Sequence, residues 1–592
     1  MNFDKIKEIP LVRLWTHLAP RRHRQFVLLL IMIVVTSFTE VLSIGAILPF
    51  LAVLTAPEKV LSLQEIRPFI EYWNFKTPNE LLFPLTMIFA GAAILAGAMR
   101  LILLWLTTKL SFATGADLSM EIYKKTLNQP YSVHVSRNSS EIVTGIVSKA
   151  NSVSGGIIQQ VLILLSSAFV LITILLGSVA INPSLAISTS LIFGLLYSSV
   201  AYAFKRKLLA NGKVIADEQT IVMKSLQEGL GGIRDVLIDG TQDVYCEAYR
   251  KSDRRFRVAQ GNNAFMSGSP RYTIEALAMV LMAFFAYSLT FSEGGFSTVI
   301  PTLGTLALGA QRMLPALQQG FQSWANLQST EAILVDVLKL LDQKLPDTYK
   351  YENSAPLRFQ SEIRGSDLYF QYNSEGPSVL KGLDFAIKKG TRIGFVGTTG
   401  SGKSTLLDIV MGLLEPTSGE LTVDGQTIRF DTVRAWQKNI AHVPQSIYLS
   451  DSSILENIAF GTPPEKIDRQ KAVRAAQQAQ ISSHIESLKE GYETIVGERG
   501  VRLSGGQRQR IGIARALYKE ASVIVFDEAT SALDNETEKA VMDAIEGLGK
   551  ELTIIMIAHR ISTVSKCDNI YEMKDGRIVK EGRYSELFAR KV

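Results

Sequence analysis

The first half of the chain is built from long apolar stretches, whereas the second half alternates short apolar runs with polar turns. A helix needs about 20 apolar residues to cross the hydrocarbon core of a bilayer, and four stretches reach that length. Two more are shorter or more polar. One such stretch is often a buried core helix, but six in one half of a chain favour a membrane domain. The predicted spans are Phe26–Leu54, Leu82–Leu106, Ile157–Ile181, Leu185–Phe204, Thr273–Leu289 and Val299–Leu317.

Basic residues beside these spans predict their orientation. The two clusters are Arg21, Arg22 and Arg24 before the first span, and Lys205, Arg206 and Lys207 after the fourth. Because positive residues stay on the cytoplasmic side, the N-terminus is expected inside. The long polar segments 107–156 and 205–271 then lie in the cytoplasm, while the outward turns at 182–183 and 291–295 are short.

A glycine-rich run in the second half fits G-x-x-x-x-G-K-[ST], a pattern that binds nucleotide phosphates. Thr391–Val396 has the pattern of a strand before it, and Leu406–Val410 that of a helix after it. This context favours a phosphate loop over a chance glycine turn, because glycines let successive N–H groups point at phosphate oxygens. Lys403 is expected to reach the terminal phosphates and Ser404 to hold Mg²⁺. The residues assigned to the nucleotide are Gly397, Thr398, Thr399, Gly400, Ser401, Gly402, Lys403, Ser404 and Thr405.

Two adjacent carboxylates follow a short apolar run further along. Val523–Phe526 has the pattern of a buried strand in a parallel sheet, and Asp527 and Glu528 come directly after it. Asp527 at the strand end is expected to bind Mg²⁺. Glu528 is placed to activate an attacking water as the general base. The alternative, a solvated pair of loop carboxylates, is disfavoured by the phosphate loop upstream.

From about Tyr372 to His559 the chain resembles the ATP-binding cassette (ABC) family, whose motifs occur here in the family's order. The resemblance implies that Tyr372 stacks on adenine, that Gln445 acts in catalysis and senses Mg²⁺, and that His559 contacts the γ-phosphate. It also implies a signature motif that closes over ATP held by another cassette, and a loop that crosses between the two sites. These residues are Ser504, Gly505, Gly506 and Gln507 in the signature and Asp534 in the crossing loop. An ATP hydrolase with ATP and Mg²⁺ as cofactors is therefore expected.

The fusion of the two halves resembles the exporter branch of that family. It implies an α-helical membrane domain of six transmembrane helices (type IV exporter-like) fused to an α/β P-loop ATPase domain. The expected boundaries are residues 1–340 for the membrane domain with its two long cytoplasmic loops, 341–356 for a linker and 357–592 for the ATPase domain. Segments 129–138 and 232–240 resemble the family's coupling segments. Because the chain carries one phosphate loop and one signature, the resemblance implies a homodimer.

Composition excludes some other functions. A net charge of +6 and a pI near 9.0 fit a positive-inside membrane protein, and no compact basic domain for nucleic acid is present. Cys246 and Cys567 both fall in predicted cytoplasmic segments, so a disulfide is not expected. The first apolar run is too long for a cleavable signal peptide. A soluble ATPase acting on DNA would share the ATP motifs but lack the six spans.

Four ionisable residues fall inside the predicted spans: Glu40, Arg100, Glu275 and Arg312. A charge at mid-bilayer costs about 2.5–3.5 kcal/mol on insertion scales, so such residues face a cavity or a partner. One hypothesis places Arg100 and Arg312 in a central cavity, where their guanidinium groups bind an anionic head group. The alternative is a structural ion pair, for example Arg100 with Glu40. Sequence alone leaves both hypotheses open.

Short segments of the membrane half, Phe38–Phe50 and Leu127–Tyr131, resemble the bacterial lipid-linked oligosaccharide flippases. The apolar spacing of Leu61–Phe75 predicts an amphipathic helix that either guides a lipid tail or simply rests on the membrane. The resemblance implies ATP-driven flipping of a polyprenyl-pyrophosphate oligosaccharide across the bacterial inner (plasma) membrane. The alternatives are a general lipid or multidrug exporter, and an ATP-gated channel or regulator, which the complete set of catalytic residues disfavours.

Overall fold

The structure is a computed structural model that describes residues 9–55, 78–181, 183–289, 296–352, 354–373, 375–528, 535–546, 552–558 and 561–588. The chain divides into two compact units. The first comprises Met1–Leu127 and Arg137–Lys344, and the second comprises Asn128–Ser136 and Leu345–Val592.

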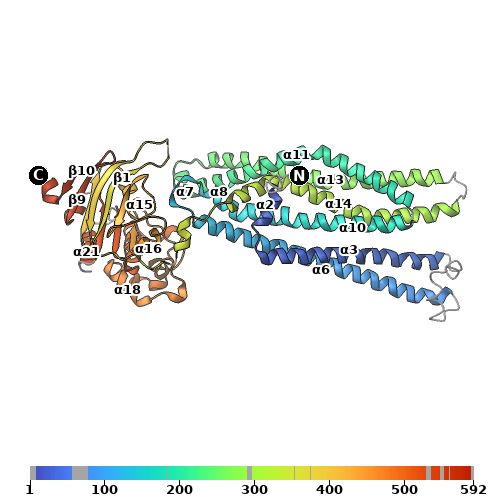
Figure 1. Ribbon diagram of the computed structural model, residues 1–592, viewed down its shortest axis with the longest axis horizontal. Coiled ribbons are helices and arrows are strands. Elements are labelled where there is room, and N and C mark those ends of the chain that lie inside the picture. Colours follow the sequence, from blue (N-terminus) through green and yellow to red (C-terminus); the bar gives the residue numbers. More distant parts are fainter. Residues whose placement is uncertain are drawn as a thin grey trace. The chain divides into compact units, whose positions relative to one another are not determined.

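Long helices form the first unit (Figure 1). Their apolar parts continue into polar segments without a break: α6 has 50 residues and is therefore about 75 Å long, more than twice the hydrocarbon thickness of a bilayer. Each predicted span falls on one of these helices, with Ile157 and Ile158 in a π-helical turn just before α10. The long helices are α3 (Pro20–Thr55), α6 (Pro78–Leu127), α10 (Gln159–Ile181), α11 (Pro183–Gly231), α13 (Gln242–Leu289) and α14 (Phe296–Leu341).

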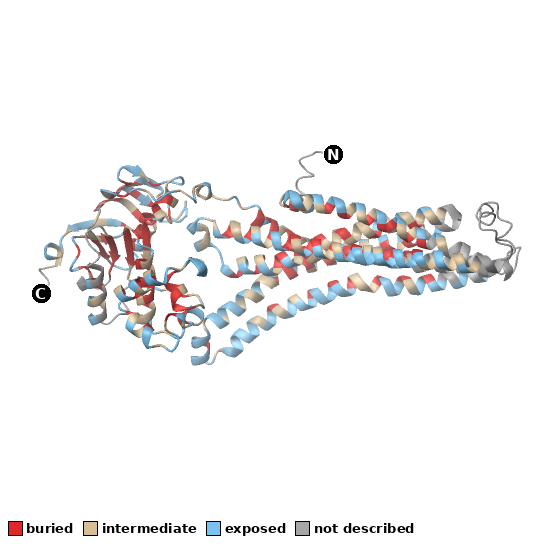
Figure 2. Ribbon diagram, turned by 90° about the horizontal axis from the view of Figure 1, so that it is seen from below, coloured by how far each residue is buried: buried red, intermediate tan, exposed pale blue. Residues whose placement is uncertain are grey.

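Three stretches of the described residues are long and apolar enough to cross a membrane: Pro20–Ser43, Leu82–Leu127 and Ser139–Gly177. Much of the surface of the long helices is exposed (Figure 2). The exposed residues include large apolar ones, for example Ile94 on α6 and Leu176 on α10. Lipid tails are as apolar as these side chains, so such faces suit a bilayer.

The helices of the first unit pack in groups. α3 lies along α6, and α11 lies along α13 and α14 (Figure 1). Near the polar ends of the helices, Lys149 is almost fully buried and its ammonium group donates to Asp336 on α14 at 2.7 Å. Shorter elements complete the unit: α2 (Pro10–Thr16), α8 (Ser139–Thr144), α9 (Ala150–Val153), α12 (Ile233–Ile238) and π-helical turns at Gly145–Lys149 and Ser154–Ile158.

The second unit contains two β-sheets. One has the strand order β2-β1-β4-β5, and the other has the order β10-β9-β3-β8-β7-β6. In the larger sheet β9, β3, β8, β7 and β6 run parallel, so their carboxyl ends meet at one edge. The strands are β1 (Glu362–Phe370), β2 (Leu380–Lys388), β3 (Arg392–Gly397), β4 (Ser418–Val423), β5 (Gln426–Thr427), β6 (Ile440–Val443), β7 (Val523–Asp527), β8 (Thr553–Ile557), β9 (Asn569–Lys574) and β10 (Arg577–Gly582).

Helices on both sides of the larger sheet bury its apolar residues. Trp436 is completely buried, and its indole N–H donates to the Val410 carbonyl at 2.8 Å. The fold class that the sequence predicts, a helical membrane domain fused to an α/β ATPase domain, is therefore confirmed. The helices of the second unit are α7 (Tyr131–Ser136), α15 (Lys403–Val410), α16 (Val433–Gln437), α17 (Ile454–Ile458), α18 (Arg469–Gln478), α19 (Ser482–Ser487), α20 (Gly505–Tyr518), α21 (Asn535–Glu546) and α22 (Tyr584–Phe588). Its 3₁₀ turns are at Asp347–Tyr351, Pro464–Lys466, Gly491–Glu493, Glu498–Gly500 and Ile561–Val564.

Candidate functional site

The phosphate loop joins β3 to α15, in the strand–loop–helix arrangement that the sequence predicts. Gly400 and Gly402 have φ angles of 82° and 95°, in the left-handed region that favours glycine. A Cβ atom at Gly397 would lie 2.2 Å from the Met573 carbonyl oxygen, and one at Gly402 would lie 2.7 Å from a methyl group of Leu380. Backbone conformation therefore favours glycine at Gly400 and Gly402, and the close approach of backbone requires it at Gly397.

The Lys403 side chain lies inside this loop. Its ammonium group donates to the carbonyl oxygens of Gly397 at 2.8 Å and Thr398 at 2.9 Å. Burial lowers the pKa of Lys403, against the attraction of Glu528 and Asp527. A phosphate group held by the loop would supply a stronger acceptor than these carbonyls, and its negative charge would raise the pKa of Lys403 again.

The two carboxylates lie at the carboxyl end of the central strands. Asp527 is the last residue of β7, and Glu528 has a φ of 51°, which is uncommon for a residue with a side chain. The Glu528 N–H donates to the Ile557 carbonyl at 3.2 Å, and the Gln445 amide nitrogen donates to the Glu528 carboxylate at 2.7 Å. The fold thus brings together two predicted catalytic residues that are 83 positions apart.

The residues at this edge fit Mg²⁺ and a nucleotide. Ser404 is exposed at the start of α15, which follows β3. Asp527 is the last residue of β7, a strand in the same sheet as β3. Carboxylate and hydroxyl oxygens together with nucleotide phosphates are the ligands that Mg²⁺ prefers. Asp527, Ser404 and Gln445 are therefore retained as the proposed metal ligands.

Sequence reasoning missed Asp408, a carboxyl group in the middle of α15. Burial, together with the smaller effect of the nearby negative charge of Asp527, raises its pKa to about 6. A visible signal was present, since Asp408 is the one acidic residue within the apolar run Leu406–Val410. A carboxyl group that can be protonated, Asp408, therefore lies near the proposed metal ligand Asp527.

Tyr372 lies beside the loop with half of its surface exposed. Its hydroxyl is 3.2 Å from the Thr405 hydroxyl, and its ring meets Phe370 edge to face at 5.0 Å. A half-exposed aromatic ring suits the predicted stacking on adenine.

The signature motif forms the N-terminus of α20. The Ser504 hydroxyl accepts from the Gln507 N–H at 3.2 Å, while the Gln507 side chain accepts from the Ser504 N–H at 2.8 Å. This reciprocal capping box orients the first turn and leaves the N–H groups of Gly505 and Gly506 at a helix N-terminus, which attracts phosphate.

Several predicted features lie outside the described residues. These are Asp534, His559 and the amphipathic segment Leu61–Phe75. Arg312 belongs to α14, but its side chain is also outside the described part of the structure.

In the membrane unit, Arg100 on α6 pairs with Glu40 on α3 through two contacts, from Nε and from a terminal nitrogen. The Glu40 side chain is 3% exposed, whereas the Arg100 side chain is 54% exposed. This is the ion pair that the structural alternative names. A second carboxylate in a predicted span, Glu275 on α13, accepts from Gln318 and from Arg271, each at 3.1 Å.

Comparison with known proteins agrees with this architecture. The family model of the ABC transporter matches residues 380–531, and that of the ABC transporter transmembrane region matches residues 26–307. The ATP-dependent lipid A-core flippase of Saccharophagus degradans is 32% identical over 485 residues, which are 80% of this chain and 79% of that protein. The flippase of the same name from Pectobacterium atrosepticum is 27% identical over 571 residues, 94% of each chain.

A solved structure of a bacterial Atm1-family ABC exporter with ATP bound shares the fold, with a TM-score of 0.78, 21% identity and 96% coverage of each chain. The matched residues include the phosphate loop, the signature motif and both carboxylates. The protein is therefore a membrane-embedded ATP hydrolase. This chain belongs to the ABC transporter family and has the exporter fold.

Proposed function

We propose that this protein uses ATP to flip an amphipathic lipid-linked substrate, most specifically a polyprenyl-pyrophosphate oligosaccharide, across the bacterial inner membrane. Two of its relatives are named lipid A-core flippases, which supports a lipid as cargo. The observation that supports an anionic head group on the substrate is the half-exposed guanidinium of Arg100 on a membrane helix. A guanidinium carries five N–H donors, more than one carboxylate accepts, so Arg100 can pair with Glu40 and bind a phosphate together.

In the ATPase unit we assign one role to each residue at the carboxyl edge of the sheet. Lys403 holds the terminal phosphates, and Ser404, Asp527 and Gln445 hold Mg²⁺. Glu528 takes a proton from the attacking water. Bound Mg²⁺ would neutralise charge on the phosphates. The hydrogen bond from Gln445 holds Glu528 in position.

We further propose a homodimer, with the N-terminus and the ATPase domain in the cytoplasm. One chain supplies one phosphate loop and one signature, so a composite site needs two chains. The short helix α12 exposes Ile233 by 45%, Leu237 by 60% and Ile238 by 73%. An apolar cluster at the tip of a predicted cytoplasmic loop favours contact with another protein surface, and a second copy's ATPase domain would supply it. We place the membrane domain at 1–340 and the ATPase domain at 357–592.

The direct test is the ATPase rate of purified protein in lipid nanodiscs with three additives: a polyprenyl-pyrophosphate oligosaccharide, lipid A-core and a hydrophobic drug. We expect stimulation by the first and none by the drug. Stimulation by lipid A-core alone would replace the proposed cargo by that of the relatives. Stimulation by the drug alone would establish the multidrug alternative.

The role of the arginines is tested separately. If Arg100 and Arg312 bind the head group, Arg100→Ala or Arg312→Ala abolishes lipid-stimulated ATPase and flipping, while basal ATPase remains. If the pair with Glu40 is only structural, Arg100→Gln expresses poorly and Glu40→Gln in the same chain restores expression. A well-folded Arg100→Ala, Arg312→Ala protein that flips at the wild-type rate would disprove the anionic cavity.

A further inference from the structure

The ATPase unit contains a cavity away from the phosphate loop. It has a volume of about 370 Å³ and is lined by residues of four separate segments. These are the turn after β2, the helix α18, the continuous stretch from the end of α20 to the start of β7, and the residue before β8. A volume of this size is in the range of small-molecule sites.

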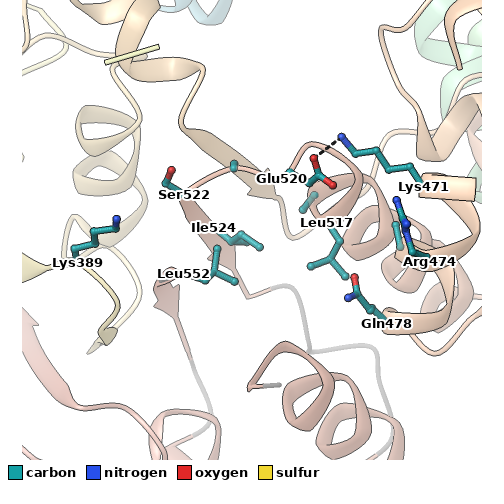
Figure 3. Close-up of a pocket in the computed structure, with 12 residues that line it drawn as sticks. Lys389, Lys471, Arg474, Gln478, Leu517, Glu520, Ser522, Ile524 and Leu552 are labelled. Atoms are coloured by element: carbon teal, nitrogen blue, oxygen red, sulfur yellow. Dashed lines mark ion pairs between the residues drawn. The ribbon is translucent and has the colours of Figure 1, made fainter. Parts of the chain in front are cut away.

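The walls of this cavity are chemically divided (Figure 3). Leu517, Ile524 and Leu552 form an apolar floor, and Lys389 lies on one side of it. Arg474 and Gln478 lie on the other side (Figure 3). An apolar floor between polar rims suits an amphipathic ligand better than a purely polar or a purely apolar one.

The charged groups of the cavity favour an anion. Three cations, Lys389, Lys471 and Arg474, face one carboxylate, Glu520. Glu520 forms an ion pair with Lys471 at 2.8 Å. Lys389 is close enough to Asp424, outside the cavity, for the two charges to interact. Within the part of the chain that the structure describes, Arg474 makes no ion pair. Its planar guanidinium is suited to a carboxylate or phosphate group.

One wall of the cavity is held in an uncommon backbone conformation. Glu520 has a φ of 54°, in the turn that leads from α20 into β7. Its ion pair with Lys471 ties this turn to α18, and the Lys471 ammonium also lies 5.1 Å from the ring of Tyr518. Strained residues of this kind concentrate at ligand sites and switch regions.

The cavity is distant from the ATP site but is connected to it by two elements. Ser522 precedes β7 and Asp527 ends it, five residues and therefore roughly 16 Å further along. The signature begins α20 and the cavity lies at the end of its 14 residues, roughly 21 Å away. A ligand that braces α18 and α20 against the sheet would restrict movement of the signature helix, on which the catalytic cycle depends.

We propose that this cavity is a regulatory site for a small amphipathic anion, which has an apolar body on Leu517, Ile524 and Leu552 and a carboxylate or phosphate on Arg474. Binding slows ATP hydrolysis by restraining α20. The site is separate from the transported substrate, so this proposal does not depend on the identity of the cargo.

The test measures binding of 1-naphthyl phosphate to full-length protein in nanodiscs by calorimetry. A non-hydrolysable ATP analogue with Mg²⁺ keeps the probe out of the phosphate loop, and empty nanodiscs correct for partition into lipid. We expect saturable binding that Arg474→Glu weakens at least tenfold, and Arg474→Gln to a smaller extent. The exposed Lys489, outside the cavity, supplies the matched control Lys489→Gln, which should bind like wild type.

Further probes test which parts of the ligand, the anionic group or the apolar body, are needed for binding. 1-Naphthoate should bind, which establishes that a carboxylate is accepted, whereas neutral 1-naphthol and inorganic phosphate should each bind at least tenfold more weakly than 1-naphthyl phosphate. At saturating ATP the probe should slow hydrolysis at least twofold in wild type and Lys489→Gln but not in Arg474→Glu. Absence of saturable binding, or equal binding by Arg474→Glu, would overturn the site. An unchanged rate with the cavity occupied would overturn its regulatory role.

Discussion

At the scale of single residues, the proposed mechanism assigns the general base to Glu528, which accepts a hydrogen bond from Gln445. Glu528→Gln removes the general base but leaves Lys403 and the loop amides in place. We expect turnover to fall about 10²–10⁴-fold, the usual contribution of a general base, while ATP binding persists and the closed, ATP-bound dimer accumulates. Phosphate release and retained nucleotide measure the two effects.

The control for this prediction is Lys403→Ala, which should weaken ATP binding itself because it removes a charge from the loop. Hydrolysis at the wild-type rate by Glu528→Gln would remove Glu528 from the mechanism.

Asp408 makes the stability of the ATPase unit depend on pH. Its folded-state pKa is raised from 3.8 to about 6. The folded state therefore binds this proton more tightly than the unfolded state, and the stability contributed by Asp408 is greatest at low pH and is lost as the pH rises through about 6. Asp408→Asn stays neutral, so we expect it to raise the unfolding temperature at about pH 7.5 and to change it little at pH 4.

The matched control is Asp431→Asn, since Asp431 is exposed in the turn before α16. Added Mg²⁺ should reduce the difference in unfolding temperature between wild type and Asp408→Asn. A cation at Asp527 would offset the negative charge that helps to raise the pKa of Asp408. An Asp408→Asn protein less stable than wild type at both pH values would show that burial does not govern this carboxyl group.

At the scale of elements, close contacts hold the long helices of the first unit together. A Cβ atom at Gly212 on α11 would lie 2.4 Å from the Ser329 carbonyl oxygen on α14. That neighbour is backbone and cannot rotate away. Gly212→Ala should therefore destabilise the protein by about 1–3 kcal/mol, as overpacking usually does, and lower the thermal midpoint in nanodiscs.

Gly261→Ala on α13 is the comparison, because a Cβ there meets nothing within 4 Å. Alanine favours a helix interior over glycine by up to about 1 kcal/mol, so this variant should be slightly more stable than wild type. Equal stability of the two variants would mean that α11 and α14 are not packed as closely as the structure shows.

At the scale of the whole molecule, the proposed composite ATP site requires two chains. Lys403→Ala spoils the phosphate loop of one chain, and Ser504→Arg spoils the signature of the other. Their heterodimer retains one site that joins an intact loop to an intact signature. In an equal mixture that pairs at random, about a quarter of the composite sites are intact.

We therefore expect partial recovery of ATP binding and hydrolysis on co-expression, with neither variant active alone, as measured by nucleotide binding and phosphate release. Full activity from isolated wild-type monomers would contradict the composite site.

Much of this protein was predictable from sequence because its signals are local. A run of about 20 apolar residues is sufficient to indicate a span, and Gly397–Thr405 between a strand and a helix is sufficient to indicate a phosphate loop. The exporter fold and the ATPase class follow from such spacings and from their order along the chain. The individual roles of the site residues remain predictions.

Other properties were decided only by the tertiary structure, because they join segments that are distant in sequence. The hydrogen bond between Gln445 and Glu528 depends on how a loop and β7 meet at one sheet edge. The sequence left Arg100 as either a cavity residue or a partner of Glu40, and the packing of α3 on α6 places the two side chains together. The raised pKa of Asp408 and the cationic cavity beside α18 likewise arise from burial and from converging segments, which no local pattern encodes.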